Sequence, residues 1–137
     1  MNATKFLDTN ILLHAYDKDA PAKREIARRL VAEGWAALGG TAVSVQVLQE
    51  FHANLEKRGV PRVKIRQLVH DFEKWPVVDH TLAVFQAALT EQTRWKIPLS
   101  QALLLAAARA SGATELLTED LNHGQDYGGL RALNPFV

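Results

Sequence analysis

The chain of 137 residues carries sixteen Lys and Arg against fifteen Asp and Glu, and 47% of its residues are hydrophobic. This length and hydrophobic share exclude an intrinsically disordered chain and fit one domain around a single core. The formal net charge of +1 identifies no partner by itself, and the absence of cysteine excludes disulfides and thiolate metal sites.

The first half of the chain alternates between strand and helix patterns. The apolar pair Phe6 and Leu7 predicts a short strand that ends before Asp8. Gly39 and Gly40 end a segment rich in helix formers, and an apolar strand then leads directly into another helix. The expected elements are a strand at 6–7, helices at 10–16 and 22–33, a strand at 41–45 and a helix at 44–59.

The second half continues this alternation. Ser100 is the expected N-cap of an apolar helix, and Gly112 is expected to end it. Strands that alternate with helices predict an α/β fold with a mostly parallel central sheet, in which ligands bind beyond the carboxyl ends of the strands. The expected elements are helices at 61–74, 81–95 and 101–111, and strands at 75–79, at 114–118 and within 130–136.

Two of these helices carry apolar residues at helical spacing. On helix 61–74 the stripe starts at Val63 or Ile65 and continues through Leu68 and Phe72. Helix 81–95 has four apolar residues on one face, which are Leu82, Phe85, Ala88 and Leu89.

Nothing in the sequence indicates export or insertion into a membrane. The N-terminal stretch MNATKFLDTN lacks the basic and then apolar pattern of a signal peptide, and no apolar run reaches the roughly 18 residues of a membrane span. No linker or repeat divides the chain. We therefore expect one cytoplasmic domain over residues 1–137 that does not enter a membrane.

Three acidic residues are candidates for chemistry. Asp8 and Asp120 each follow a predicted strand, and each taken alone is interpreted as a helix cap or a turn residue. Two acids at the ends of two parallel strands favour a shared site. Glu50 lies off the apolar stripe of its helix, which fits a solvated surface and a residue facing a groove equally well.

Other chemistries find little support. The five His show no HExxH motif and no pair at the spacing of zinc ligands, and His52 is interpreted as a core or interface residue. Ser44 and Ser100 lack the motif of a nucleophilic serine, and no glycine-rich phosphate loop is present. Four further acids lie in polar stretches and are interpreted as surface or turn residues, namely Asp17, Asp19, Glu119 and Asp126.

A basic cluster surrounds Gly59. It fits two interpretations, a surface that binds a phosphate backbone or a solvated corner between two helices. Its members are Lys57, Arg58, Arg62, Lys64 and Arg66.

Three segments together resemble a known family. LDTNILLHAYD at 7–17, SVQVLQEF at 44–51 and LLTEDLNHGQDYGGLRALNPF at 116–136 are similar to the PIN-domain ribonucleases, and most of all to the VapC-type toxins of toxin–antitoxin pairs. The resemblance implies an α/β/α sandwich with a mostly parallel central sheet. It also implies an acidic pocket that holds Mg²⁺, with Mn²⁺ as the alternative, and that cleaves RNA endonucleolytically.

The resemblance assigns roles to individual residues. It implies that Asp8, Glu50 and Asp120 are both the catalytic acids and the metal ligands. It also implies that Asn10 and Thr118 are supporting polar residues. Asn122 matches a secondary position that is acidic in some relatives.

Residue 101 departs from the family pattern. Gln101 stands where the family has a further metal-binding acid, and Leu99 and Ser100 stand where relatives usually carry aromatic residues. The amide oxygen of Gln101 can ligate a metal or hold a water, but it brings no charge and cannot act as a base. Natural divergence and an engineered inactivating change both remain open.

The resemblance also implies partners. These are an RNA substrate, a small antitoxin protein and a second copy of the chain in a homodimer. A catalytically inactive PIN fold that binds RNA or an antitoxin is the alternative to an active nuclease. The aromatic candidates for a surface that binds a partner protein are Trp35, Trp75, Trp95 and Phe136.

Overall fold

Five parallel strands form the centre of the molecule. The structure, a computed structural model, describes residues 3–137. The strands lie in the order β3-β2-β1-β4-β5, and every neighbouring pair is parallel, so the predicted sheet is confirmed. The strands are β1 (Lys5–Leu7), β2 (Thr41–Ser44), β3 (Val77–Val78), β4 (Glu115–Leu117) and β5 (Arg131–Leu133).

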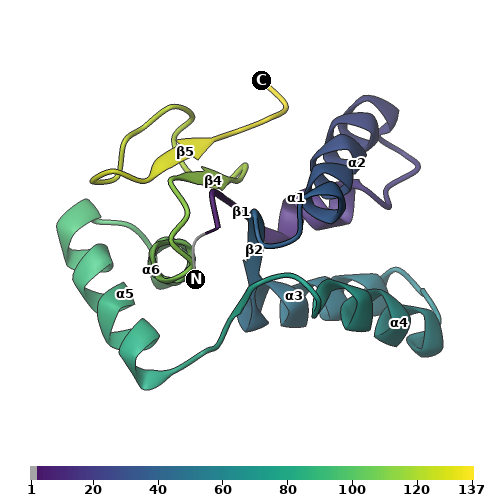
Figure 1. The fold of residues 1–137 in the computed structure, drawn as a ribbon, viewed down its shortest axis with the longest axis horizontal. Coiled ribbons are helices and arrows are strands. Elements are labelled where there is room, and N and C mark those ends of the chain that lie inside the picture. Colours follow the sequence, from purple (N-terminus) through teal and green to yellow (C-terminus); the bar gives the residue numbers. More distant parts are fainter. Residues whose placement is uncertain (1–2) are drawn as a thin grey trace.

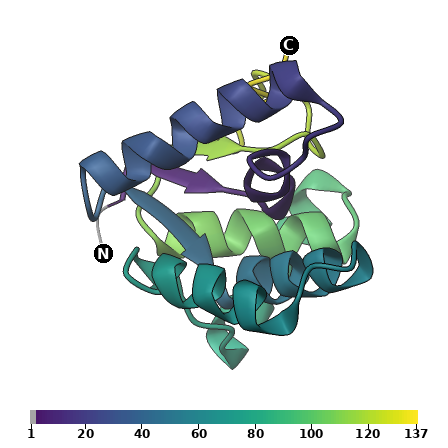
Figure 2. The same ribbon diagram turned by 90° about the vertical axis from the view of Figure 1, so that its right-hand side faces the viewer.

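Helices cover both faces of this sheet, as Figures 1 and 2 show. In Figure 2, α2 lies on one face, and α3, α4 and α6 lie on the other. This arrangement confirms the expected α/β/α sandwich, and it explains why Phe6 and Leu7 in the central strand are fully buried. The helices are α1 (Thr9–His14), α2 (Pro21–Ala36), α3 (Val45–Lys57), α4 (Arg62–Phe72), α5 (Leu82–Trp95) and α6 (Leu99–Ala110).

Aromatic side chains fill the core between α2, α3 and α4. The Phe72 ring packs edge-on against Phe51 and Trp75, with ring centroids 5.8 and 5.0 Å apart. Trp35 stacks on Phe72 from α2 and remains 37% exposed, whereas Trp75 is only 3% exposed. Trp75 is therefore a core residue rather than part of a surface for a partner, and Trp95 is half-buried beside Tyr127.

The apolar face of α5 lies mostly outside the core. Of its four residues only Ala88 is buried, while Leu82 is 70% exposed and Leu89 is 42% exposed. The helix packs against α6, and the small residues Ala102 and Ala106 form the contact with Ala88. A narrow strip of alanines is enough for this contact, so the larger side chains remain on the surface.

On α4, Ile65 is fully buried and Val63 is 82% exposed, so the apolar stripe of this helix starts at Ile65 and not at Val63.

The start of α6 differs from the prediction. The helix begins at Leu99, its N-cap is Pro98, and Ser100 lies within the first turn instead of capping it. The carbonyl of Pro98 accepts hydrogen bonds from the backbone N–H groups of Gln101 and Ala102. Proline has a preset φ that suits the start of a helix, so a side-chain cap is not required there. Within residues 3–137, no helix is long and apolar enough to cross a membrane.

Candidate functional site

Three acidic side chains meet at the carboxyl edge of the sheet. Asp8 directly follows β1, Asp120 lies three residues after β4, and Glu50 lies in the second turn of α3, which continues directly from β2. Because β2, β1 and β4 are neighbours, their carboxyl ends bring these residues together. All three acids and Gln101 line one small cavity of about 60 Å³, whose other lining residues are Ser44, Gln46, Val47, Ser100 and Leu104.

Asp8 is the buried centre of the site. Its Oδ1 accepts a hydrogen bond of 2.6 Å from the backbone N–H of Thr9, and its Oδ2 accepts one of 2.8 Å from the Thr118 hydroxyl. The first bond makes Asp8 the N-cap of α1, so the capping interpretation is confirmed, and Asp8 also lines the acidic cavity. Burial raises the pKa of the Asp8 carboxyl to about 7. The charges of Asp120 and Glu50 also raise this pKa, and the hydrogen bonds from Thr118 and Thr9 oppose the rise.

Asn10 and Thr118 connect Asp8 to Asp120. The Asn10 amide nitrogen donates to Oδ2 of Asp8 and to Oδ2 of Asp120, at 3.3 Å in both cases. The Thr118 hydroxyl, which donates to Asp8, also accepts a bond of 3.0 Å from the backbone N–H of Asp120. Both residues therefore lie where the family resemblance places supporting residues. Asn10 Oδ1 is buried and has no hydrogen-bond partner in the part of the chain that the structure describes.

Glu50 is held by residues that the sequence analysis did not identify. Its Oε2 accepts a 2.9 Å bond from the Thr9 hydroxyl, and its Oε1 accepts a 3.1 Å bond from the Gln46 amide. The spacing of four between Gln46 and Glu50 was a visible signal, because such pairs share one face of a helix. The bond from Thr9 joins α1 to α3, and no pattern in the sequence predicts this contact between two distant segments.

Gln101 forms a neutral wall of the cavity. It lies in the first turn of α6 and is half-buried. Its side chain makes no hydrogen bond to any of residues 3–137, so the amide is free to bond a ligand or a water. Ser100 lines the cavity beside it and is a second polar residue whose place in the site the sequence pattern did not indicate.

Two residues near Asp120 have different surroundings from those expected. Asn122 is exposed and donates a 2.7 Å hydrogen bond to Gln125, and it does not line the acidic cavity. Glu119, interpreted from the sequence as a surface or turn residue, is half-buried and pairs with His14 at 2.6 Å and with Lys23 at 2.7 Å. Burial opposes ionisation of Glu119, but its bonds to Lys23 and His14 outweigh burial and hold its pKa below the usual value.

The donors of the acidic cavity fit a hard divalent cation in type and charge. Within residues 3–137 no group of three or more Asp, Glu or His side chains is already arranged as a metal cage. However, the cavity is lined by three carboxylates and by no Lys or Arg. Burial raises the pKa of Asp8, and the charges of Asp120 and Glu50 add to the rise. Carboxylate and amide oxygens are the ligands that Mg²⁺ and Mn²⁺ prefer.

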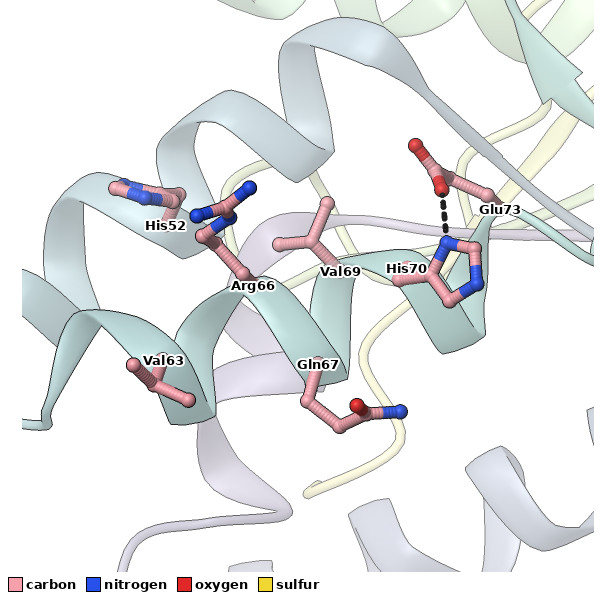
Figure 3. Close-up of a pocket in the computed structure, with 7 residues that line it drawn as sticks. All are labelled: His52, Val63, Arg66, Gln67, Val69, His70 and Glu73. Carbon is pink, nitrogen blue, oxygen red and sulfur yellow. Dashed lines mark hydrogen bonds and ion pairs between the residues drawn. The ribbon is translucent and has the colours of Figure 1, made fainter.

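Larger cavities lie elsewhere and lack this chemistry. One of about 490 Å³ opens along α4, and Figure 3 shows that His52 and Arg66 lie at one end of it. At its other end, His70 and Glu73 form an ion pair of 2.9 Å. The half-buried His52 therefore lines a groove rather than the core. Size alone does not select the candidate site in this molecule, because Asp8, Glu50 and Asp120 gather only in the small cavity.

Comparison with known proteins identifies the family and similar folds. The sequence profile of the PIN domain family matches residues 5–125. A toxin–antitoxin complex from Klebsiella pneumoniae contains a similar chain, with a TM-score of 0.73 and 18% identity over 96% of this chain and 98% of that chain. The sarcin-ricin loop cleaving toxin VapC20 from Mycobacterium tuberculosis has a TM-score of 0.65 and 18% identity over 85% of this chain and 90% of that chain. No curated protein matches the sequence significantly.

Proposed function

Because the chain belongs to the PIN-domain family, we propose that it is a metal-dependent endoribonuclease and the toxin of a type II toxin–antitoxin pair. The observation that carries this proposal is the shared cavity of Asp8, Glu50 and Asp120. The two similar structures support it, since one comes from a toxin–antitoxin complex and the other is a toxin that cleaves the sarcin-ricin loop. RNA is then the substrate, and the cytoplasm is the expected place of action.

The cation has a defined place in this proposal. Asp8, Glu50 and Asp120 would hold Mg²⁺, or Mn²⁺ in its place, and the bound ion would lower the pKa of a water and offset the negative charge that builds on the phosphate. Without a cation, these carboxylates repel one another, and the repulsion lowers the stability of the folded protein. Such a cluster is therefore typical of a functional site.

The chain's own residues orient the acids. Thr118 and the backbone of Thr9 fix both oxygens of Asp8, and Asn10 sets its distance from Asp120. The Thr9 hydroxyl and Gln46 fix Glu50 from two sides. Carboxylates fixed in this way would hold a metal ion with little further ordering, which lowers the entropic cost of reaching the transition state.

A cleavage assay tests this proposal. Purified protein would be incubated with structured RNAs and with Mg²⁺ or Mn²⁺, beside the variants Asp8→Asn and Asp79→Asn. Asp79 is exposed and lies outside the acidic cavity, so its variant matches the loss of charge without touching the site. We expect cleavage by the wild type and by Asp79→Asn, and none by Asp8→Asn. Equal cleavage by all three, or by none of them, would contradict the proposal.

Gln101 favours a second candidate function. With an amide in place of the family's further acid, the chain is alternatively a PIN fold that binds RNA or an antitoxin without catalysis. Loss of one unit charge near a divalent cation weakens its binding, by several kcal/mol at most.

The variant Gln101→Asp separates the two functions. If the amide is what limits the native chain, Gln101→Asp gains metal-dependent cleavage and binds Mn²⁺ more tightly in a calorimetric titration. Unchanged cleavage and unchanged Mn²⁺ affinity would show that the amide is irrelevant to the reaction, and would count against the inactive binding module if the wild type already cleaves.

We also propose two protein partners, an antitoxin and a second copy of the chain. The Klebsiella structure supports the first, since it is a toxin–antitoxin complex. The exposed apolar residues Leu82, Phe85 and Leu89 on α5 support the second, because a soluble protein rarely exposes such a face without a partner.

A further inference from the structure

The largest described cavity that is rich in charge lies beyond the acidic site. It has a volume of about 770 Å³ and lies between the α1–α2 connection, α2 and the end of α3 with the start of α4. Five cationic side chains line it against two acids, Asp17 and Asp19. We call it the cationic cavity, and its basic residues are Lys18, Arg24, Arg28, Arg58 and Lys64.

These five cations are unpaired. Within residues 3–137 none of them forms an ion pair, whereas Lys5, Lys23, Arg29, Arg62 and Arg109 all do. Arg24 Nε is buried and has no hydrogen-bond partner, and Arg28 Nε donates only to the backbone carbonyl of Ala15. A buried guanidinium nitrogen without a hydrogen-bond partner is costly, so this free donor favours a ligand that supplies negatively charged oxygens.

The cationic cavity lies on the same edge of the sheet as the acids. The two are joined by α1, which starts at the capping residue Asp8, and by α3, which carries both Glu50 and Arg58. Arg58 lies eight positions after Glu50, which is roughly 12 Å along the helix axis at about 1.5 Å per residue. Figure 2 shows the α1–α2 and α3–α4 connections on the side toward which β1 and β2 point.

An aromatic ring lies among these cations. Tyr16 lines the cationic cavity, is 36% exposed, and rests on Phe51 with ring centroids 5.8 Å apart. Burial raises the pKa of the Tyr16 hydroxyl, with Asp71 adding to the rise and Arg28 opposing it, so the ring stays uncharged at neutral pH. A flat neutral ring beside unpaired cations is the combination that binds single-stranded nucleic acid, through stacking of a base and neutralisation of phosphates.

We infer that the cationic cavity binds the RNA backbone next to the cleavage position, with Arg58 and Lys64 on phosphates and Tyr16 beneath a base. The inference rests on the proposed function, which names RNA as the substrate. A stacked strand advances about 3.4 Å per nucleotide, so the cavity meets the strand roughly three to four nucleotides from the acids. An acidic peptide would also satisfy the charges, but it would offer Tyr16 no planar base.

Binding measured without cleavage tests the charges. Fluorescence anisotropy would follow a fluorescein-labelled 12-nucleotide single-stranded RNA in EDTA, with Arg58→Gln/Lys64→Gln compared with Arg29→Gln/Lys96→Gln. Both pairs remove one Arg and one Lys, and Arg29 and Lys96 are exposed residues outside the cationic cavity. We call the double variant Arg58→Gln/Lys64→Gln the cavity pair, and we expect only this variant to bind RNA about tenfold more weakly. The slope of the logarithm of the binding constant against the logarithm of the salt concentration should become shallower by about 1.4, which corresponds to two lost phosphate contacts. Equal behaviour of the two pairs would overturn the inference.

Two further measurements test the aromatic ring and the class of ligand. Tyr16→Leu should weaken binding about tenfold at every salt concentration without changing the slope. Phe85→Leu, at a ring 37% exposed on α5, should have no effect. Polyglutamate of equal charge serves as the competitor. If the cavity pair loses affinity for polyglutamate and keeps that for RNA, an acidic peptide is the ligand and the inference is wrong.

The outcomes separate this inference from the proposed function. A wild type that cleaves RNA while the cavity pair binds RNA normally would refute only the cavity as a binding site. A wild type that binds RNA through the cavity and cleaves nothing would refute only the nuclease. Thermal unfolding of each variant checks that a loss of binding is not a loss of fold.

Discussion

At the scale of single residues, Asp8 has two functions in one position. Its carboxylate caps α1 through Thr9 and also lies at the centre of the acidic cavity. A cap alone would favour an ionised side chain, because the N-terminus of a helix is positive. Burial and the neighbouring acids outweigh this effect and raise the pKa to about 7. The site therefore carries a cost in the absence of metal.

This cost predicts how stability depends on pH. The folded-state pKa of Asp8 lies near 7 and the unfolded value is 3.8, so the folded state retains a proton that the unfolded state has lost between these values. In EDTA, the free energy of unfolding should therefore fall as the pH rises from about 4 to about 7, by no more than about 4 kcal/mol. Asp8→Asn should remove this fall, since asparagine also caps a helix.

Urea unfolding of both proteins in EDTA at several pH values measures this difference. The variant should equal the wild type near pH 4 and exceed it at pH 8. A difference between the two proteins that is the same at every pH would contradict the raised pKa.

At the scale of elements, close contacts decide how the helices pack. Gly34 on α2 is buried against the Trp75 ring, and a Cβ at this position would lie 2.4 Å from Trp75 Cζ2. A glycine inside a helix is normally unfavourable by about 1 kcal/mol relative to alanine. Here the absence of a side chain allows α2 to approach the aromatic core, which the sequence pattern of α2 did not reveal.

The variant Gly34→Ala should therefore destabilise the protein. Helix propensity alone predicts a gain of about 1 kcal/mol, whereas the clash with Trp75 predicts a net loss of about 1–3 kcal/mol. Denaturant unfolding gives the sign. In the background of Trp75→Leu, where the ring is absent, Gly34→Ala should lower the free energy of unfolding much less. A more stable Gly34→Ala protein would show that α2 moves away at little cost.

At the scale of the whole molecule, α5 carries three of the eight exposed large hydrophobic residues in the part of the chain that the structure describes. Figure 1 shows it at the outer edge, beside α6. Its inner side is anchored through Glu91, which is 7% exposed and accepts hydrogen bonds from Arg109 of α6 and from Trp95. The helix is thus held firmly on one side and leaves Leu82, Phe85 and Leu89 outward. This arrangement suits a second copy of the chain.

A single charge on this face should prevent dimer formation. If the wild type is dimeric through α5, Leu89→Glu places an unpaired charge in an apolar interface and should give a monomer. Sedimentation velocity measures the change. Ala83→Glu adds the same charge to an exposed position of α5 that is turned away from Leu82, Phe85 and Leu89, and this variant should remain dimeric. A wild type that is monomeric at tens of micromolar would contradict the proposed dimer.

Local patterns were sufficient for the element order and for two of the three acids that line the cavity. Strand ends are visible in the sequence, so Asp8 and Asp120 were placed together from the parallel topology alone. Glu50 could not be assigned from periodicity, because a solvated helix surface and a groove produce the same pattern. The family resemblance supplied that residue, and it also supplied Gln101, which lines the same cavity. It likewise suggested Asn122, which the structure places outside.

The order of strands and helices, the parallel sheet and the two acids at strand ends were determined by the sequence itself. They depend on hydrophobic periodicity and on chain breaks, which act over a few residues. The tertiary structure alone decided that Thr9 holds Glu50, that Gly34 receives Trp75, and that Arg24 and Arg28 join Arg58 around one cavity. These contacts join residues that are about thirty or more positions apart, and only the packing of helices on the sheet brings such residues together.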